Sequence, residues 1–532
     1  MDQAMSFDWR FPYASQRMPV LARNVVATSQ PLASQAGLEM LAKGGNAVDA
    51  ALAAAICLTV VEPTSNGLGG DAFALVWDGR ELHGFNGSGR SPAEMRLERF
   101  SGRQSMPDLG WESVTVPGAV DAWSRLSKRF GALPFQALFG PAMGYAREGF
   151  QVSPMTASTW SSLVPRYADF PSWRAMFCPR GRAPRAGELF ACPDQADSLK
   201  AIGESHGESF YRGDLARSIA DKSEREGGLL RYEDLAEHAG EWVSPIGTDY
   251  RGARLLEVPP NGQGLAALIA LGILERLDLS DMPGIDSAES IHLQVEAMKL
   301  AFVEVFGHVA DPLAMRCSPE CFLQAGYLDN LAGRIDPERA AGPGPVPARS
   351  GGTVYLSAAD AQGMMVSFIQ SNYTGFGSGV VVEGTGISLQ NRGAGFVLEP
   401  GHPNVVAERK RPFHTIIPGF VTVDGRPAMS IGVMGGHMQP QGHVQMLVRI
   451  HGYRQNPQAA LDAPRWHLGP DLALSLEPGF PPGIAESLQH KGHVMDLDPA
   501  PSLFGGGQIV HCLEKGYLAA SDPRKDGQAV GF

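Results

Sequence analysis

This sequence contains few cysteines, no long apolar run and no segment with the pattern of a secretory leader. Six Cys in 532 residues are too sparse for a disulfide scaffold. Cys317 and Cys321 form a C-x3-C pair, but no second Cys or His pair at zinc spacing follows nearby, so we expect no metal site. No stretch approaches 18 uninterrupted apolar residues, and MDQAMSFDWRFPYASQR lacks the apolar segment of a signal peptide. These absences predict a cytoplasmic protein with no membrane partner.

Positive charge is also in short supply. The 44 Lys and Arg residues face 56 Asp and Glu residues, which gives a formal net charge of −12. Nucleic acids and anionic membrane surfaces both attract concentrated Lys and Arg, so neither is expected as a partner. The chain is 44% hydrophobic and 19% charged, which is typical of a globular protein with a large core.

The character of the chain changes near residue 352. The part before it is mainly helical in pattern, and 336–352 (DPERAAGPGPVPARSGG) reads as a flexible surface connector rich in Gly and Pro. Alternating segments with short turns follow, and helical segments lie between them. The expected strands are 353–358, 364–371, 420–423, 428–433, 505–512 and 517–520. Strand pairs followed by helices predict sheets covered by helical layers, an α+β sandwich.

Two motifs resemble known sites but lack the required context. Gly203–Gly207 (GESHG) matches the G-x-S-x-G nucleophile elbow, which needs a buried strand just before the serine. The preceding residues have a helical pattern instead, so Ser205 is expected in a helix-end turn. Asn66–Asp71 (NGLGGD) is glycine-rich but lies after a helix and before a strand, the reverse of a phosphate-binding loop. We interpret it as a close-packed turn.

Gly352-Thr353 is the position where chemistry is expected. A threonine at the start of a strand is usually structural, because β-branched residues favour strands. Cleavage of the Gly352–Thr353 bond would change its role, since the new α-amino group, with an ordinary pKa of about 7.7–8.0, supplies a base beside the hydroxyl. A glycine immediately upstream adopts the strained backbone that an N→O acyl shift requires.

The chain resembles the γ-glutamyltranspeptidase family of N-terminal-nucleophile hydrolases over nearly its whole length. The motifs include PLASQAGLEMLAKGGNAVDAALAAAICLTVVEPTSNGLGGD, VTVPGAVDAW, TVYLSAADAQG, FGSGVVVEGTGISLQNRGAGF, KRPFHTIIP, GVMGGHMQPQGHVQ and SDPRKDG. The resemblance implies a four-layer αββα sandwich. It also implies a catalytic Thr353, released by self-cleavage into a large fragment, 1–352, and a small fragment, 353–532. Ser371 then supplies a second hydroxyl beside the nucleophile, and Gly435 and Gly436 hold the oxyanion through their backbone N–H groups.

The acyl pocket departs from the family pattern. Within Asn391–Phe396, Arg392 stands where an amide is expected and Gly395 where an acidic residue is expected. A cation there should repel an α-ammonium group and attract a carboxylate. The paired serines of the family are replaced by His414-Thr415, and Tyr373, which follows Asn372, replaces an Asn. The segment between Phe396 and Lys410 is shorter than the usual lid loop, which implies a more open site. Arg90 is a candidate for the family's carboxylate-binding arginine, although its spacing differs.

The resulting hypothesis is a self-processing threonine amidohydrolase or acyltransferase acting on small amides. The family favours γ-glutamyl transfer or hydrolysis with glutathione-like substrates, whereas the pocket favours another carboxylate-bearing amide of the oxamate or glutaryl type. Two further alternatives stay open: a catalytically silent binding protein, and a serine hydrolase using Ser205. We expect no metal or organic cofactor. The fragments should stay associated as a heterodimer, with a higher oligomer possible, and the substrate-binding residues are predicted to be Arg90, Asn372, Tyr373, Arg392, His414 and Thr415.

Overall fold

The expected strands all lie within two seven-stranded antiparallel sheets in the computed structural model, which describes residues 17–277, 284–342, 351–469 and 471–532. The first sheet has the order β21 (Gln528–Gly531), β2 (Val25–Thr28), β10 (Gly352–Ala359), β11 (Met365–Tyr373), β3 (Asp71–Trp77), β4 (Leu82–Asn86) and β7 (Glu241–Val243). The second has the order β1 (Val20–Ala22), β20 (Tyr517–Ser521), β19 (Gly506–Cys512), β15 (Arg426–Met434), β14 (Gly419–Val423), β9 (Ala253–Glu257) and β8 (Ile246–Tyr250).

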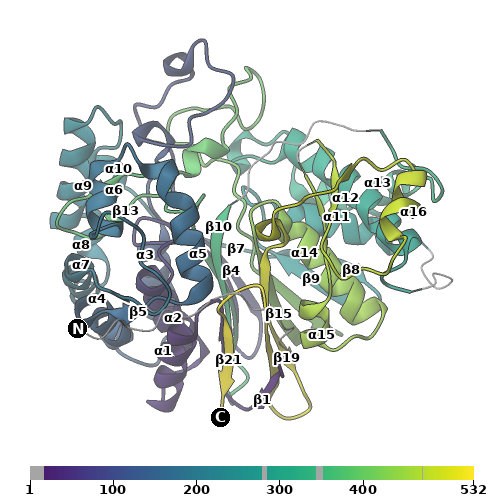
Figure 1. The fold of residues 1–532 in the computed structure, drawn as a ribbon, viewed down its shortest axis with the longest axis horizontal. Coiled ribbons are helices and arrows are strands. Elements are labelled where there is room, and N and C mark those ends of the chain that lie inside the picture. The colour runs from purple at the N-terminus through teal and green to yellow at the C-terminus, as the bar shows by residue number, and fades with distance from the viewer. Residues whose placement is uncertain (1–16, 278–283, 343–350, 470) are drawn as a thin grey trace, which may run out of the picture.

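Helices cover the outer face of each sheet, so the fold is the expected four-layer αββα sandwich (Figure 1). The first sheet packs against α1 (Pro31–Ala42), α2 (Ala47–Val61) and α3 (Ala119–Phe130), with α4 (Gly140–Glu148) and α7 (Pro193–Glu204) outside them. The second packs against α11 (Gly264–Leu274), α14 (Met438–Leu447) and α15 (Pro457–Asp462), with α12 (Ala288–His308) and α13 (Ala325–Ala332) against α11.

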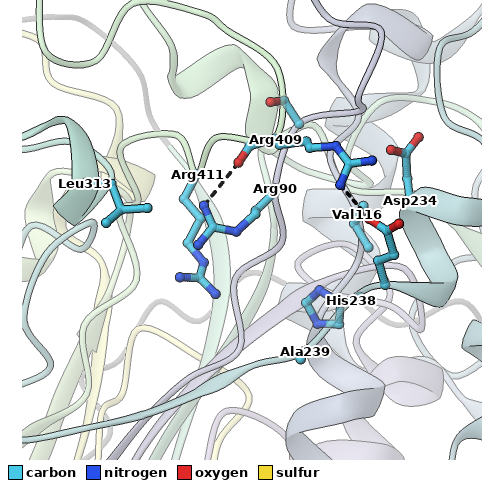
Figure 2. Close-up of a pocket in the computed structure, with 10 residues that line it drawn as sticks. Arg90, Val116, Asp234, His238, Ala239, Leu313, Arg409 and Arg411 are labelled. Atoms are coloured by element: carbon cyan, nitrogen blue, oxygen red, sulfur yellow. Dashed lines mark hydrogen bonds and ion pairs between the residues drawn. The ribbon is translucent and has the colours of Figure 1, made fainter.

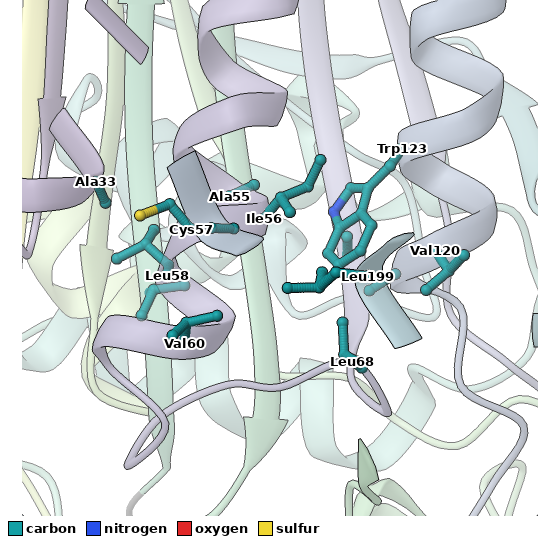
Figure 3. Packing of buried hydrophobic residues seen from close by; sticks show 14 of the residues in the cluster. Ala33, Ala55, Ile56, Cys57, Leu58, Val60, Leu68, Val120, Trp123 and Leu199 are labelled. Carbon is teal, nitrogen blue, oxygen red and sulfur yellow. The ribbon is translucent and has the colours of Figure 1, made fainter. Parts of the chain in front are cut away.

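The sequence of α2 directly predicts its place between two layers of the sandwich. It has no polar face, and every one of its residues is buried between the first sheet and the outer helices. Figure 3 shows Ile56 of this helix on the side of Trp123 and Leu199 from neighbouring helices, and Cys57 on the side of Ala33. Asn46 begins the helix through a capping box with Asp49, which satisfies backbone donors that would otherwise be buried unpaired.

Both sheets mix strands from the two expected fragments. In the first, β2 of the N-terminal part lies between β21 and β10 of the C-terminal part, and β11 pairs with β3. In the second, β14, β15, β19 and β20 lie between β1 and β9. Cutting the chain before Thr353 would therefore leave each sheet held together by hydrogen bonds between fragments, which is the physical reason to expect a stable heterodimer.

The connector is more ordered at its start than its composition predicts. Asp336 and Ala341 are held by α12, because His292 pairs with the Asp336 carbonyl at 2.8 Å and Glu296 accepts from the Ala341 backbone N at 2.9 Å. Residues 343–350 of the predicted connector lie outside the described residues. Within the described part of the chain, no helix has the length and apolarity needed to cross a membrane.

The contact between the sheets gives a stability prediction. Gly432 of β15 faces the ring of Tyr355 on β10, and a Cβ at Gly432 would lie 2.2 Å from a ring carbon. Gly432→Ala is expected to lower the free energy of unfolding by about 1–3 kcal/mol, because the buried ring has to move. Thermal unfolding measures the loss. Gly307→Ala on α12, where a Cβ meets nothing within 4 Å, is the matched control and should not destabilise. Equal midpoints for the two variants would contradict this packing.

Candidate active site

Thr353 lies inside the first sheet with its hydroxyl directed at a second hydroxyl. Its Oγ1 donates to Ser371 Oγ on β11 at 3.3 Å, and Ser371 Oγ donates to the carbonyl oxygen of Gly352 at 2.7 Å. The ladder between β10 and β11 is irregular between Gly352 and Val354. The carbonyl that Thr353 would attack is therefore already polarised by a hydrogen bond.

The turn after β15 borders the same place. Gly435 and Gly436 have φ values of 118° and 62°, which favour glycine. Gly351 lies against this turn, because a Cβ there would be 3.2 Å from the Gly436 Cα. Two glutamines, not singled out from the sequence, contact this region. Gln263 Nε2 donates to the Gly436 carbonyl at 2.8 Å, and Gln439 Nε2 lies 3.5 Å from Thr353 Oγ1.

Arg392 is buried beside these hydroxyls. Its Nη2 donates to Ser371 Oγ at 3.1 Å and its Nη1 to Thr415 Oγ1 at 2.8 Å, and its guanidinium carbon lies 4.3 Å from the ring centroid of Tyr373. None of the described carboxylates forms an ion pair with it, and its Nε has no hydrogen-bond partner there. Burial lowers the pKa of Arg392 to about 10, which still leaves a cation at neutral pH. Arg392 is thus a buried charge whose contacts are neutral.

A carboxylate and an imidazole form the next layer. His414 Nδ1 accepts from the Ile416 backbone N at 3.3 Å, which assigns the proton to Nε2, the atom 3.1 Å from Asp71 Oδ2. Burial, with Arg392 nearby, holds the pKa of His414 well below its usual range. Burial raises the pKa of Asp71 to about 7, and the Arg392 charge opposes that rise. Asp71 pairs in register with Ser371 across β3 and β11. Asp71 is the last residue of the motif NGLGGD. The sequence pattern predicts a turn there and does not identify Asp71 as a site residue.

Two predicted binding residues lie elsewhere. Arg90 lines a separate pocket with Arg409 and Arg411 (Figure 2), and its guanidinium pairs with Asp311 at 2.7 Å. Asn372 is buried on the opposite face of β11 from Ser371, where its amide lies beside Gly67 and has no hydrogen-bond partner among the described residues. The structure brings Ser371, Tyr373, Arg392 and Thr415 together around Thr353, with His414 behind them.

The open side of Thr353 is a cleft of about 460 Å³. It is lined by the glycines on either side of the reaction centre, by α5 (Pro154–Leu163) and by the C-terminal loop that contains Lys525. None of its lining residues comes from the segment between Phe396 and Lys410, where the usual lid loop was expected to be shortened. That segment packs instead on Met95, Phe100 and Met106.

Other candidate sites have structural explanations. Ser205 ends α7, and its Oγ donates to the Ala201 carbonyl at 2.6 Å, which confirms the helix-end turn. The ligand atoms of His292, Glu296 and His493 lie within 4.8 Å of one another, a spacing suited to a cation. However, the Lys299 ammonium lies 2.7 Å from the Glu296 carboxylate and already neutralises it.

Asp71 gives a pH-dependent stability prediction. Because burial raises its pKa to about 7, the folded protein holds this proton more tightly than the unfolded chain does. The stabilisation is complete below the ordinary carboxyl pKa and is lost as pH rises through about 7. The melting temperature of the wild type should therefore fall relative to that of Asp71→Asn between pH 5 and pH 8. A difference that stays constant across this range would contradict the assignment.

Comparisons with known proteins agree on one family. The gamma-glutamyltranspeptidase family model matches residues 33–532. A glutathione hydrolase-like proenzyme of Bacillus subtilis is 38% identical, covering 96% of this chain and 98% of its own, and an oxamate amidohydrolase proenzyme of Klebsiella pneumoniae is 34% identical, covering 94% and 97%. The crystal structure of a cephalosporin acylase from Bacillus halodurans has a TM-score of 0.95 at 47% identity, covering 99% of both chains. The chain therefore belongs to the gamma-glutamyltranspeptidase family of N-terminal-nucleophile hydrolases.

Proposed function

We propose that this proenzyme cuts itself between Gly352 and Thr353 and then hydrolyses or transfers a small acyl group that bears a carboxylate. The observation behind the substrate class is Arg392, a buried guanidinium without an ion-pair partner among the described residues, one hydroxyl away from the nucleophile. An uncompensated buried charge costs several kcal/mol, and a substrate carboxylate would offset that cost.

Self-cleavage uses the contacts already formed in the precursor. Thr353 Oγ1 attacks the Gly352 carbonyl carbon, and Ser371, which donates to that carbonyl oxygen, stabilises the negative charge that develops on it. The C–N bond then breaks, the hydroxyl proton passes to the departing nitrogen, and an ester joins Gly352 to Thr353 Oγ1. Water hydrolyses the ester and releases fragments 1–352 and 353–532.

Turnover repeats this chemistry on an external amide. The free α-amine of Thr353 takes the hydroxyl proton, a general-base role that contributes roughly 10²–10⁴-fold. The backbone N–H groups of Gly435 and Gly436 hold the oxyanion, and removing one such donor typically costs about 2.7–4 kcal/mol of barrier stabilisation. Water or an amine then resolves the acyl-threonine.

Charge distinguishes the candidate acyl groups. Glutaryl and γ-glutamyl groups have the same chain and terminal carboxylate, and differ in the α-ammonium of the latter. Arg392 attracts the carboxylate, whereas Gly395 provides no charge to pair with an ammonium group. This favours glutaryl- or oxamate-type amides, in line with the amidohydrolase named among the relatives. The glutathione hydrolase-like relative supports γ-glutamyl compounds as the second candidate.

Cleavage is tested by the intact mass of the purified protein. The wild type should give two masses, those of 1–352 and 353–532, whereas Thr353→Ala should give one full-length mass because the attacking hydroxyl is gone. Ser205→Ala is the control and should cleave and react normally. An active wild type that stays in one piece would contradict the proposal, and so would loss of activity on Ser205→Ala alone.

The acyl group is tested with 4-nitroanilides that share one leaving group. The wild type is expected to turn over glutaryl anilide faster than γ-glutamyl or butyryl anilide. Because a hydrogen bond to a charged group is worth about 1.5–3 kcal/mol, Arg392→Met should lower kcat/KM for the glutaryl substrate roughly ten- to a hundredfold more than for the butyryl one. Arg392→Lys, which keeps the charge, should restore part of the difference. Equal losses on both substrates would mean that Arg392 only supports Ser371.

A further inference from the structure

Two partly exposed cysteines lie close together in the connection between α12 and α13. Cys317 precedes the 3₁₀ helix Pro319–Leu323, and Cys321 lies inside it. The chain turns back between them, because the Cys321 backbone N donates to the Ser318 carbonyl at 3.1 Å. Both side chains are free thiols. Neither lines the cleft beside Thr353, so their chemistry is separate from the proposed reaction.

The two thiols act on each other directly. Burial raises the pKa of the Cys317 thiol, and the adjacent Cys321 thiol raises it further through its charge and a hydrogen bond. Ser318 Oγ lies 3.8 Å from Cys321 Sγ and completes a polar contact around the pair. Residues whose thiols already hydrogen-bond need little backbone movement to reach the close Cα spacing that a disulfide requires.

The connection that carries the two cysteines is anchored on each side of them. On the N-terminal side, Arg316 Nη2 donates to the Gly401 carbonyl at 2.9 Å. On the C-terminal side, Phe322 is buried, and its ring centroid lies 5.8 Å from that of Tyr327 on α13. Because the folded chain already holds the two thiols together, a bond between them costs little further ordering, an advantage that a bond to a second molecule does not have.

The other four cysteines are unsuited to oxidation. Cys57, Cys178 and Cys192 are buried, and burial raises the pKa of Cys192 to about 11. Cys512 Sγ donates to Met365 Sδ at 3.3 Å, and burial raises the pKa of this thiol to about 11 as well. Because the thiolate is the form that reacts, these four should be slow to exchange with an oxidant.

We propose that Cys317 and Cys321 form a reversible disulfide, with a low-molecular-weight disulfide such as glutathione disulfide as the oxidant. One cysteine thiolate attacks a sulfur of the oxidant and releases one thiol as the leaving group. The thiolate of the second cysteine then attacks the mixed disulfide and releases the other thiol. The two cysteines thereby lose two electrons and two protons, and the oxidant is reduced to the two thiols that carry them. This redox site does not depend on the function proposed above.

Mass spectrometry after treatment with glutathione disulfide tests the inference. The tryptic peptide 317–334 contains both cysteines and has no internal Lys or Arg, so a bond between them lowers its mass by two hydrogens. In the treated wild type, quenched with iodoacetamide, this peptide should have that mass, with neither thiol alkylated and no glutathione attached. Dithiothreitol should restore two alkylatable thiols. The uncut Thr353→Ala chain should respond in the same way, which separates this result from failure of self-cleavage.

Matched variants distinguish an internal disulfide from other thiol reactions. Cys321→Ser removes the second thiol, so Cys317 should instead accumulate the mixed disulfide with glutathione. Cys512→Ser should behave like the wild type, and melting temperatures verify that each variant folds. The rate of disulfide formation in the wild type should rise between pH 7 and pH 8, because the thiolate is the attacking form.

Several results would overturn the inference. They are a wild-type peptide that keeps both thiols, one that carries glutathione, and one that is linked to another cysteine. A Cys321→Ser variant that forms no mixed disulfide, or a rate independent of pH, would contradict the exchange steps.

Discussion

A buried guanidinium beside Thr353, with no ion-pair partner among the described residues, is the interaction on which the proposed site depends. Arg392 donates to Ser371 and Thr415 and lies over the Tyr373 ring, contacts that hold a cation in place without neutralising it. Asp71 balances part of the Arg392 charge without contacting it. Burial and the Arg392 charge together lower the pKa of His414 and keep it neutral. Tyr373, whose ring lies beside the Arg392 guanidinium, has a left-handed backbone with φ of 79° at the end of β11.

The fold makes this arrangement possible by joining distant segments at one end of the first sheet. β10 supplies Thr353, its partner β11 supplies Ser371, and the adjacent β3 supplies Asp71. The turn of Gly435 and Gly436, which we propose holds the oxyanion, follows β15 of the second sheet, so the proposed reaction centre lies between the two sheets. Because strands from both sides of the Gly352–Thr353 bond pair with one another in each sheet, the framework should survive the proposed cut.

Local sequence patterns and motifs predict part of this picture. The connector followed by alternating strands predicts the sandwich fold and points to Gly352-Thr353 as the position of the chemistry. The departures from the family pattern within Asn391–Phe396 identify Arg392 as unusual. The supporting residues were not predicted, because their roles arise from long-range contacts. Gln263 donates a hydrogen bond to Gly436, which lies 173 residues later in the chain. Asp71 on β3 pairs with the distant His414. Arg90 lies in a different pocket because its pairing with Asp311 fixes it there, a contact that spacing along the chain does not reveal.

A crystal structure of the cleaved protein with bound glutarate tests the central claim most directly. The account predicts one glutarate carboxylate within hydrogen-bond distance of the Arg392 guanidinium and the other facing the Thr353 hydroxyl and the backbone N–H groups of Gly435 and Gly436. A glutarate bound elsewhere in the cleft, with Arg392 still contacting only Ser371 and Thr415, would contradict it.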